Sequence, residues 1–261
     1  MNPSSLQARA TLATLPLSFP EPTGVVFVDG DPSWPAKLLR AMRSGATAGI
    51  VLVRPAPVEF AELLGAEPST PVVIDSPWVS NPTTGLAAQA FGSVATSSCR
   101  VECRVVVEPG ADFATALLDQ MVLIRTVLGQ VTQLRIRHVS ERALHADGLT
   151  DTSVAIDFTI VGTAGLPSSA NLRLLTPEGS VELLIPSTDT AQPARLTTVG
   201  PAGAVLAPTH YETSHRASLR RLRELQATGS ADGLAELRRL HADVLLTTAA
   251  FGDHLAAQAP A

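Results

Sequence analysis

Three ionisable side chains occur where the sequence could bring them to a binding cleft. Arg54 ends a short apolar run, Asp119 lies in a helical pattern and His138 lies in an alternating one. A carboxylate, an imidazole and a guanidinium could serve as base, proton carrier and anion-binding group, which would suit a cofactor-free elimination, isomerisation or cyclisation. His145, with Asp147 and Gly148, is expected in a loop that could approach the same cleft. Thr115 is a further candidate for contacting substrate.

Each candidate also has a structural interpretation. Arg54 could form a surface ion pair, and a single carboxylate on a helix, such as Asp119, is commonly solvated or paired. His138 shares a strand face with Leu134 and Ile136, so we expect its ring on the covered side of a sheet, a position that favours a hydrogen-bonded core histidine over a catalytic one. Thr115 could be purely structural.

Composition excludes several other classes of function. A net charge of −5 with 19 basic residues argues against nucleic-acid binding, and no apolar run approaches the roughly 20 residues of a membrane span. The two cysteines, Cys99 and Cys103, are too far apart along one strand to bridge easily and lack the partners of a metal site. No Gly-x-Ser-x-Gly motif is present. Without a secretory signal pattern, a reducing cytoplasm is the expected location.

The first ninety residues alternate between buried strands and helices. This order favours parallel pairing with right-handed crossovers, as in half of a doubly wound sheet. The expected strands are 25–28, 49–53 and 71–75. We expect one helix through Leu38, Leu39 and Met42, with Gly45 as its C-terminal cap, and a weaker helix through residues 60–64.

The pattern then changes to strands in which apolar and polar residues alternate. Such strands, joined by short loops, indicate a mostly antiparallel sheet with helices on one face. The expected strands are 101–107, 131–139 and 154–160 and a hairpin over 172–185, with a long helix over 113–128 and closing helices over about 209–226 and 233–250. The predicted fold is therefore a partial Rossmann-like α/β domain, residues 1–92, followed by an α+β sheet domain, residues 93–261.

Three stretches carry a resemblance to a known family. They are the helix, glycine and strand end from Ala41 through Pro55, the helix from Leu117 that ends in Leu128-Gly129-Gln130-Val131, and the hairpin from Leu175 to Leu183. In this order they resemble the Gfo/Idh/MocA family, named for glucose-fructose oxidoreductase and inositol dehydrogenase. The likeness spans about residues 25–251.

The sequence also departs from that family where the chemistry occurs. The Gly-x-Gly-x-x-Gly turn that cradles a dinucleotide pyrophosphate is absent from the sequence. Arg54 replaces the family lysine and would be a poor proton shuttle, because arginine stays protonated. The resemblance puts Asp119 and Thr115 at the positions of the catalytic histidine and aspartate. It therefore implies an N-terminally truncated, catalytically degenerate member that holds no cofactor.

The resemblance implies two alternative functions. In the first, the protein is a non-catalytic or regulatory subunit, a homodimer or a heteromer with a full-length oxidoreductase paralogue. Its open sheet face would be buried by the partner, since Val106 and Val139 interrupt the polar faces of their strands. In the second, a cofactor-independent lyase, isomerase or cyclase uses Asp119, His138 and Arg54 on a sugar-like or secondary-metabolite substrate.

Overall fold

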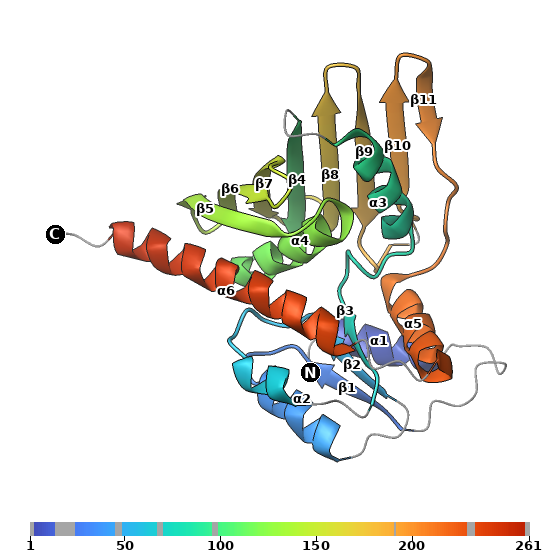
Figure 1. Ribbon diagram of the computed structural model, residues 1–261, viewed down its shortest axis with the longest axis vertical. Coiled ribbons are helices and arrows are strands. Elements are labelled where there is room, and N and C mark those ends of the chain that lie inside the picture. The colour runs from blue at the N-terminus through green and yellow to red at the C-terminus, as the bar shows by residue number, and fades with distance from the viewer. Residues whose placement is uncertain are drawn as a thin grey trace. The chain divides into compact units, whose positions relative to one another are not determined.

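The computed structural model describes residues 3–13, 24–44, 49–66, 70–95, 99–190, 192–228 and 233–258. Gly45, the expected helix cap, lies outside these ranges. Within them no helix is long and apolar enough to cross a membrane. The elements, all but η1 labelled in Figure 1, are α1 (Pro3–Ala13), β1 (Val25–Asp29), α2 (Trp34–Arg43), β2 (Gly49–Val53), η1 (Ala61–Gly65), β3 (Val72–Asp75), α3 (Thr83–Val94), β4 (Arg100–Val107), α4 (Phe113–Val127), β5 (Val131–Val139), β6 (Ala143–Thr150), β7 (Ala155–Gly162), β8 (Ser169–Thr176), β9 (Gly179–Pro186), β10 (Arg195–Gly200), β11 (Gly203–Leu206), α5 (Ser214–Thr228) and α6 (Gly233–Gln258).

The chain forms two compact units. The first comprises residues 1–80 and 213–245, and the second comprises residues 81–212 and 246–261. Thus α5 and the first half of α6 belong with the parallel sheet, whereas the sequence order suggested that they close the larger sheet.

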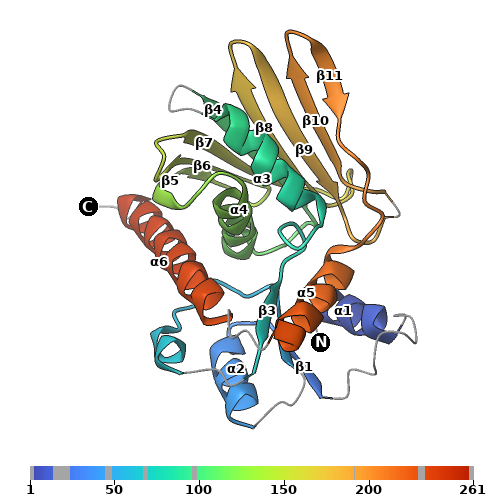
Figure 2. The same cartoon turned by 45° about the vertical axis from the view of Figure 1, so that its right-hand side comes forward.

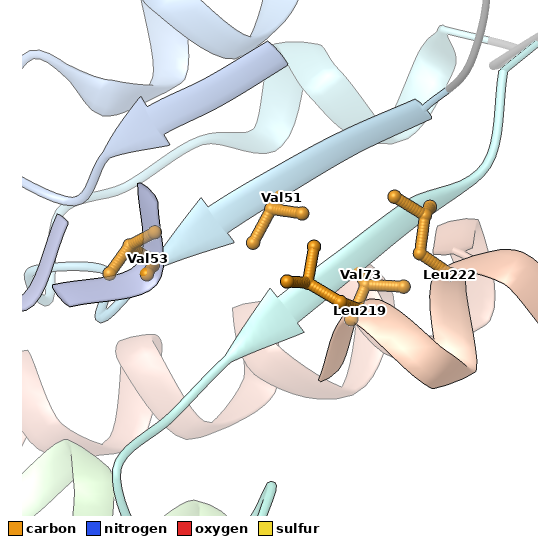
Figure 3. Close-up of a cluster of buried hydrophobic side chains, with 6 residues drawn as sticks. Val51, Val53, Val73, Leu219 and Leu222 are labelled. Carbon is orange, nitrogen blue, oxygen red and sulfur yellow. The ribbon is translucent and has the colours of Figure 1, made fainter. Parts of the chain in front are cut away.

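The first unit is built on a three-stranded parallel sheet in the order β1-β2-β3, as predicted. Every residue of β2 is buried, which agrees with its continuous apolar sequence. Helix α5 covers one face: Leu219 and Leu222 pack with Val51, Val53 and Val73 in a hydrophobic cluster (Figure 3). Helix α2 packs against β1 and β2. The weak helix expected at 60–64 is the 3-10 turn η1.

The second unit contains an eight-stranded sheet in the order β11-β10-β9-β8-β4-β7-β6-β5. All neighbouring pairs are antiparallel except β4 and β7, which are parallel. Helix α3 packs against β9 and β10, and α4 packs against β4, β5 and β7 (Figure 2). The predicted mostly antiparallel sheet is therefore confirmed, with β6, β10 and β11 as strands that the sequence analysis did not identify.

Two local sequence signals define the ends of α4. Asp112 is the N-cap, and its carboxylate accepts hydrogen bonds from the backbone N–H groups of Ala114 and Thr115 at 3.2 and 3.1 Å. Gly129, with a φ of +116°, follows the C-terminal turn, as predicted. Inside the helix, the buried Gln120 amide donates to the carbonyls of Cys103 and Thr159 at 2.8 and 3.2 Å, which fixes α4 to the parallel strand pair.

Candidate functional site

The carboxyl edge of the parallel sheet gathers polar groups from all three of its strands. Asp29, Val53 and Asp75 are successive register partners across β1, β2 and β3. Arg54 follows directly, with a φ of 46°, and its backbone N–H donates to the Asp75 carbonyl at 2.9 Å. In open α/β sheets this edge is where ligands bind.

The loops at this edge are packed closely against one another. A Cβ atom added at Gly30 would lie 2.1 Å from the Arg54 carbonyl oxygen, so only glycine fits there. The Ala56 N–H donates to the Gly30 carbonyl at 2.7 Å. Asp31 accepts hydrogen bonds from Lys37 and Ser33, which lower the pKa of its carboxyl group to about 2. The neighbouring loops therefore hold the Arg54 backbone in the left-handed region, which is unusual for a residue other than glycine.

A buried polar cluster attaches α5 to the same edge. Asp75 accepts from His215 Nδ1 at 2.5 Å and from Ser218 Oγ at 2.7 Å, and all three residues are at most 4% exposed. Ser214 Oγ donates to the Pro77 carbonyl at 2.7 Å. Sequence analysis missed this cluster, although an aspartate closing a buried strand and a His-x-x-Ser spacing on one helical face were available signals.

Among the described residues of this unit, several side-chain polar atoms are buried without a hydrogen-bond partner, and two of them lie at or just after the ends of the outer strands. They are Asp29 Oδ1, at the end of β1, and Trp78 Nε1, in the segment that follows β3. Buried polar groups are almost always hydrogen-bonded in folded proteins, so these two atoms are exceptions within the unit.

The predicted catalytic residues are divided between the two compact units. Arg54 belongs to the first compact unit, whereas Thr115, Asp119, His138 and His145 belong to the second. Asp119 is buried in α4, at 4% exposed. Thr115 donates through Oγ1 to the N-cap Asp112 at 2.6 Å, so its hydroxyl is occupied in capping the helix.

The two histidines lie where sequence analysis did not put them. His138 is exposed, because the β5–β6 register shifts between Ile136 and His138 and turns the ring away from the face that Ile136 shares. His145 and Asp147 are in β6 rather than in a loop. The rings of His138 and His145 lie 6.3 Å apart, on the face opposite to buried Leu144 and Ala146.

That face of the large sheet carries ordered rows of polar side chains. One row runs through register partners on all eight strands: Arg135, Asp147, Asp157, Glu102, Arg173, Glu182, Thr197 and Leu206. Ion pairs join Arg100 to Asp157 and Arg137 to Asp147. At the β10–β11 end the face becomes apolar, with Val199 and Leu206 42% and 58% exposed. We call this surface the open face.

The combination of a parallel Rossmann-like sheet with a larger mixed sheet matches the two-domain fold of the Gfo/Idh/MocA-type oxidoreductases. Among solved structures, the chain is similar to KijD10, a 3-ketoreductase from Actinomadura kijaniata in complex with NADP. The TM-score is 0.63 at 15% identity, covering 86% of this chain and 75% of KijD10.

Two further solved structures share the fold. A Thermotoga maritima protein provisionally described as an oxidoreductase matches 96% of this chain and 85% of its own, with 14% identity and a TM-score of 0.60. An Agrobacterium radiobacter oxidoreductase, in complex with NAD+, L-tartaric acid and magnesium, has 15% identity and a TM-score of 0.57, covering 87% of this chain and 77% of its own. No family model and no curated protein matches the sequence.

Proposed function

We propose that this protein is a subunit that assembles through its open face, rather than an oxidoreductase that transfers hydride by the route of the family it resembles. The observation that carries the proposal is the open face itself. It combines cross-strand rows of both charge signs with exposed apolar side chains at one end. Exposed apolar residues beside paired charges are typical of protein–protein contact surfaces.

The residues at the family's catalytic positions support the same proposal. Arg54 replaces a lysine that would move a proton, and a guanidinium stays protonated. Thr115 is committed to the cap of α4 through Asp112. The sequence has no Gly-x-Gly-x-x-Gly turn to hold a pyrophosphate.

The alternative of a cofactor-free active site loses its geometric basis. It required Asp119 and His138 to approach one substrate from the same side. Asp119 lies in the helix that covers one face of the large sheet, while His138 is exposed on the open face. Its remaining test is whether Asp119→Asn and His138→Ala each abolish turnover of a pathway intermediate.

A face-specific substitution tests the assembly. Leu206 lies on the open face. Its neighbour Val205, which pairs with Thr198, lies on the other face of the sheet and is also exposed, at 67%. We expect light scattering at micromolar concentration to show an oligomer for the native chain. Leu206→Asp should dissociate it, because a buried carboxylate is costly, and Val205→Asp should not.

A native chain that is monomeric both alone and after co-purification from its host would overturn the proposal. A stoichiometric complex with a different protein would identify a heteromer, and a self-complex would identify a homodimer. In either case Leu206→Asp should weaken the complex at least tenfold relative to Val205→Asp.

A further inference from the structure

The two exposed histidines form a cross-strand pair on the open face. His138 of β5 and His145 of β6 are register partners, and their ring centroids lie 6.3 Å apart with an interplanar angle of 31°. Both side chains are exposed. The bulge that brings His138 onto this face therefore creates the pair, since strict alternation would have put the ring on the other side.

The geometry is close to that of two imidazoles bound to one ion. With metal–nitrogen bonds of about 2.0–2.1 Å, two tetrahedral histidine ligands have ring centroids roughly 5 Å apart. The observed 6.3 Å separation needs a shift of about 1 Å, which exposed side chains can make by rotating about χ2.

Neighbouring side chains prepare the pair for this role. His145 Nδ1 lies 3.4 Å from Thr159 Oγ1 on the adjacent strand. When Nδ1–H donates to this hydroxyl, the lone pair of Nε2 faces outward, and such hydrogen bonds orient metal-binding histidines in general. The nearest cation along β5, Arg137, is neutralised by its ion pair with Asp147.

We infer that His138 and His145 form a bidentate surface site for a divalent transition-metal ion that prefers imidazole, such as Zn²⁺ or Ni²⁺. Among the described residues no group of three or more His, Cys, Asp or Glu side chains is placed to hold a metal. Water therefore completes the coordination. Hard cations such as Mg²⁺ and Ca²⁺, which need oxygen ligands, should not bind here.

Calorimetric titration of the untagged full chain with Zn²⁺ tests the site. We expect one ion per chain, with affinity reduced at least tenfold by His138→Ala and by His145→Ala. His210→Ala is the matched control, because His210 is an exposed histidine outside the pair. Bound Zn²⁺ should also raise the melting temperature of the native chain and of His210→Ala, but not of the paired-site variants.

The metal site and the assembly are separable in this experiment. Repeating the titration with Leu206→Asp exposes the pair even if the native open face is covered. Two outcomes would overturn the site. One is equal Zn²⁺ affinity in the native chain, His138→Ala and His145→Ala. The other is no Zn²⁺ binding by either the native chain or Leu206→Asp. Zn²⁺ binding by a chain that never oligomerises would leave the site intact and overturn the proposed assembly.

Discussion

Cys103 is a potential nucleophile whose reactivity is suppressed by burial. Its side chain is 1% exposed, and burial raises the pKa of the thiol to about 12, with a smaller opposing effect from the Gln120 amide. Because the thiolate is the nucleophile, we expect iodoacetamide to leave Cys103 unmodified in the folded protein at pH 8 and to alkylate it fully in denaturant, as measured by mass spectrometry. Rapid native alkylation at this residue would show that α4 separates readily from the sheet.

Gly30 tests whether the close loop packing at the carboxyl edge matters. A Cβ atom there would lie 2.1 Å from the backbone oxygen of Arg54, so Gly30→Ala should force the two loops apart and cost about 1–3 kcal/mol. Gly65→Ala is the control, since nothing lies within 4 Å of its added Cβ atom. Urea denaturation compares the two variants. Equal unfolding free energies for the two variants would mean that the Arg54 loop can move aside without a loss of stability.

At the residue scale, sequence predicted which groups were present but not how they were oriented. Gly129 was correctly identified as the residue after α4, because positive φ is a local property of the chain. His138 was assigned to the wrong face, because one bulge inverts the period-two rule and has no clear sequence signature. The Asp75–His215 contact joins residues 140 apart in sequence, so the local signals at each residue could not show that the two side chains meet.

The attachment of α5 to the parallel sheet depends on a buried polar cluster as well as on apolar packing. His215→Ala would leave the Asp75 carboxylate buried with one hydrogen-bond partner fewer, and we expect a loss of about 3–5 kcal/mol in unfolding free energy. Arg216→Ala, at an exposed position of the same helix, should change stability by less than about 0.5 kcal/mol.

Chemical denaturation followed by circular dichroism measures both variants. A double variant, His215→Ala with Asp75→Ala, should lose less stability than the sum of the two single losses, because it removes the unpaired charge. Strict additivity would show that the two groups do not interact in solution.

At the scale of elements, periodicity located most strands and helices but not all of their boundaries. The helix expected from about residue 209 begins later: α5 begins at Ser214, and Thr213 Oγ1 accepts from the Arg216 N–H at 3.3 Å. Strands β10 and β11 were missed, because Thr197, Thr198 and the exposed residues 203–206 lack an alternating apolar face. Both errors arise where short-range signals are weak.

For the molecule as a whole, the proposed function predicts no dinucleotide binding at physiological concentration. The sequence has no glycine-rich turn opening a helix, so the backbone N–H groups that would hold a pyrophosphate have no counterpart in it. Calorimetric titration with NADPH and with NADH should show no heat of binding. A micromolar dissociation constant would contradict this prediction and favour an oxidoreductase function for the protein.

The first compact unit is discontinuous in sequence. Sequence reasoning assigned all residues after 92 to one domain, because consecutive elements are usually neighbours in space. The first unit instead takes residues 213–245 from late in the chain. The reason is energetic: the apolar residues of β2 and β3 require a helix on that face, and Leu219 and Leu222 of α5 supply it.

This discontinuity sets the order in which a ribosome can complete the two units. The strands that emerge first, β1 to β3, remain without their α5 cover until more than half of the polypeptide has followed them. Every strand of the larger sheet is synthesised in the meantime. The parallel sheet is thus completed late in synthesis, and until α5 is made its valines lack the helix that covers them, which favours association with other apolar surfaces.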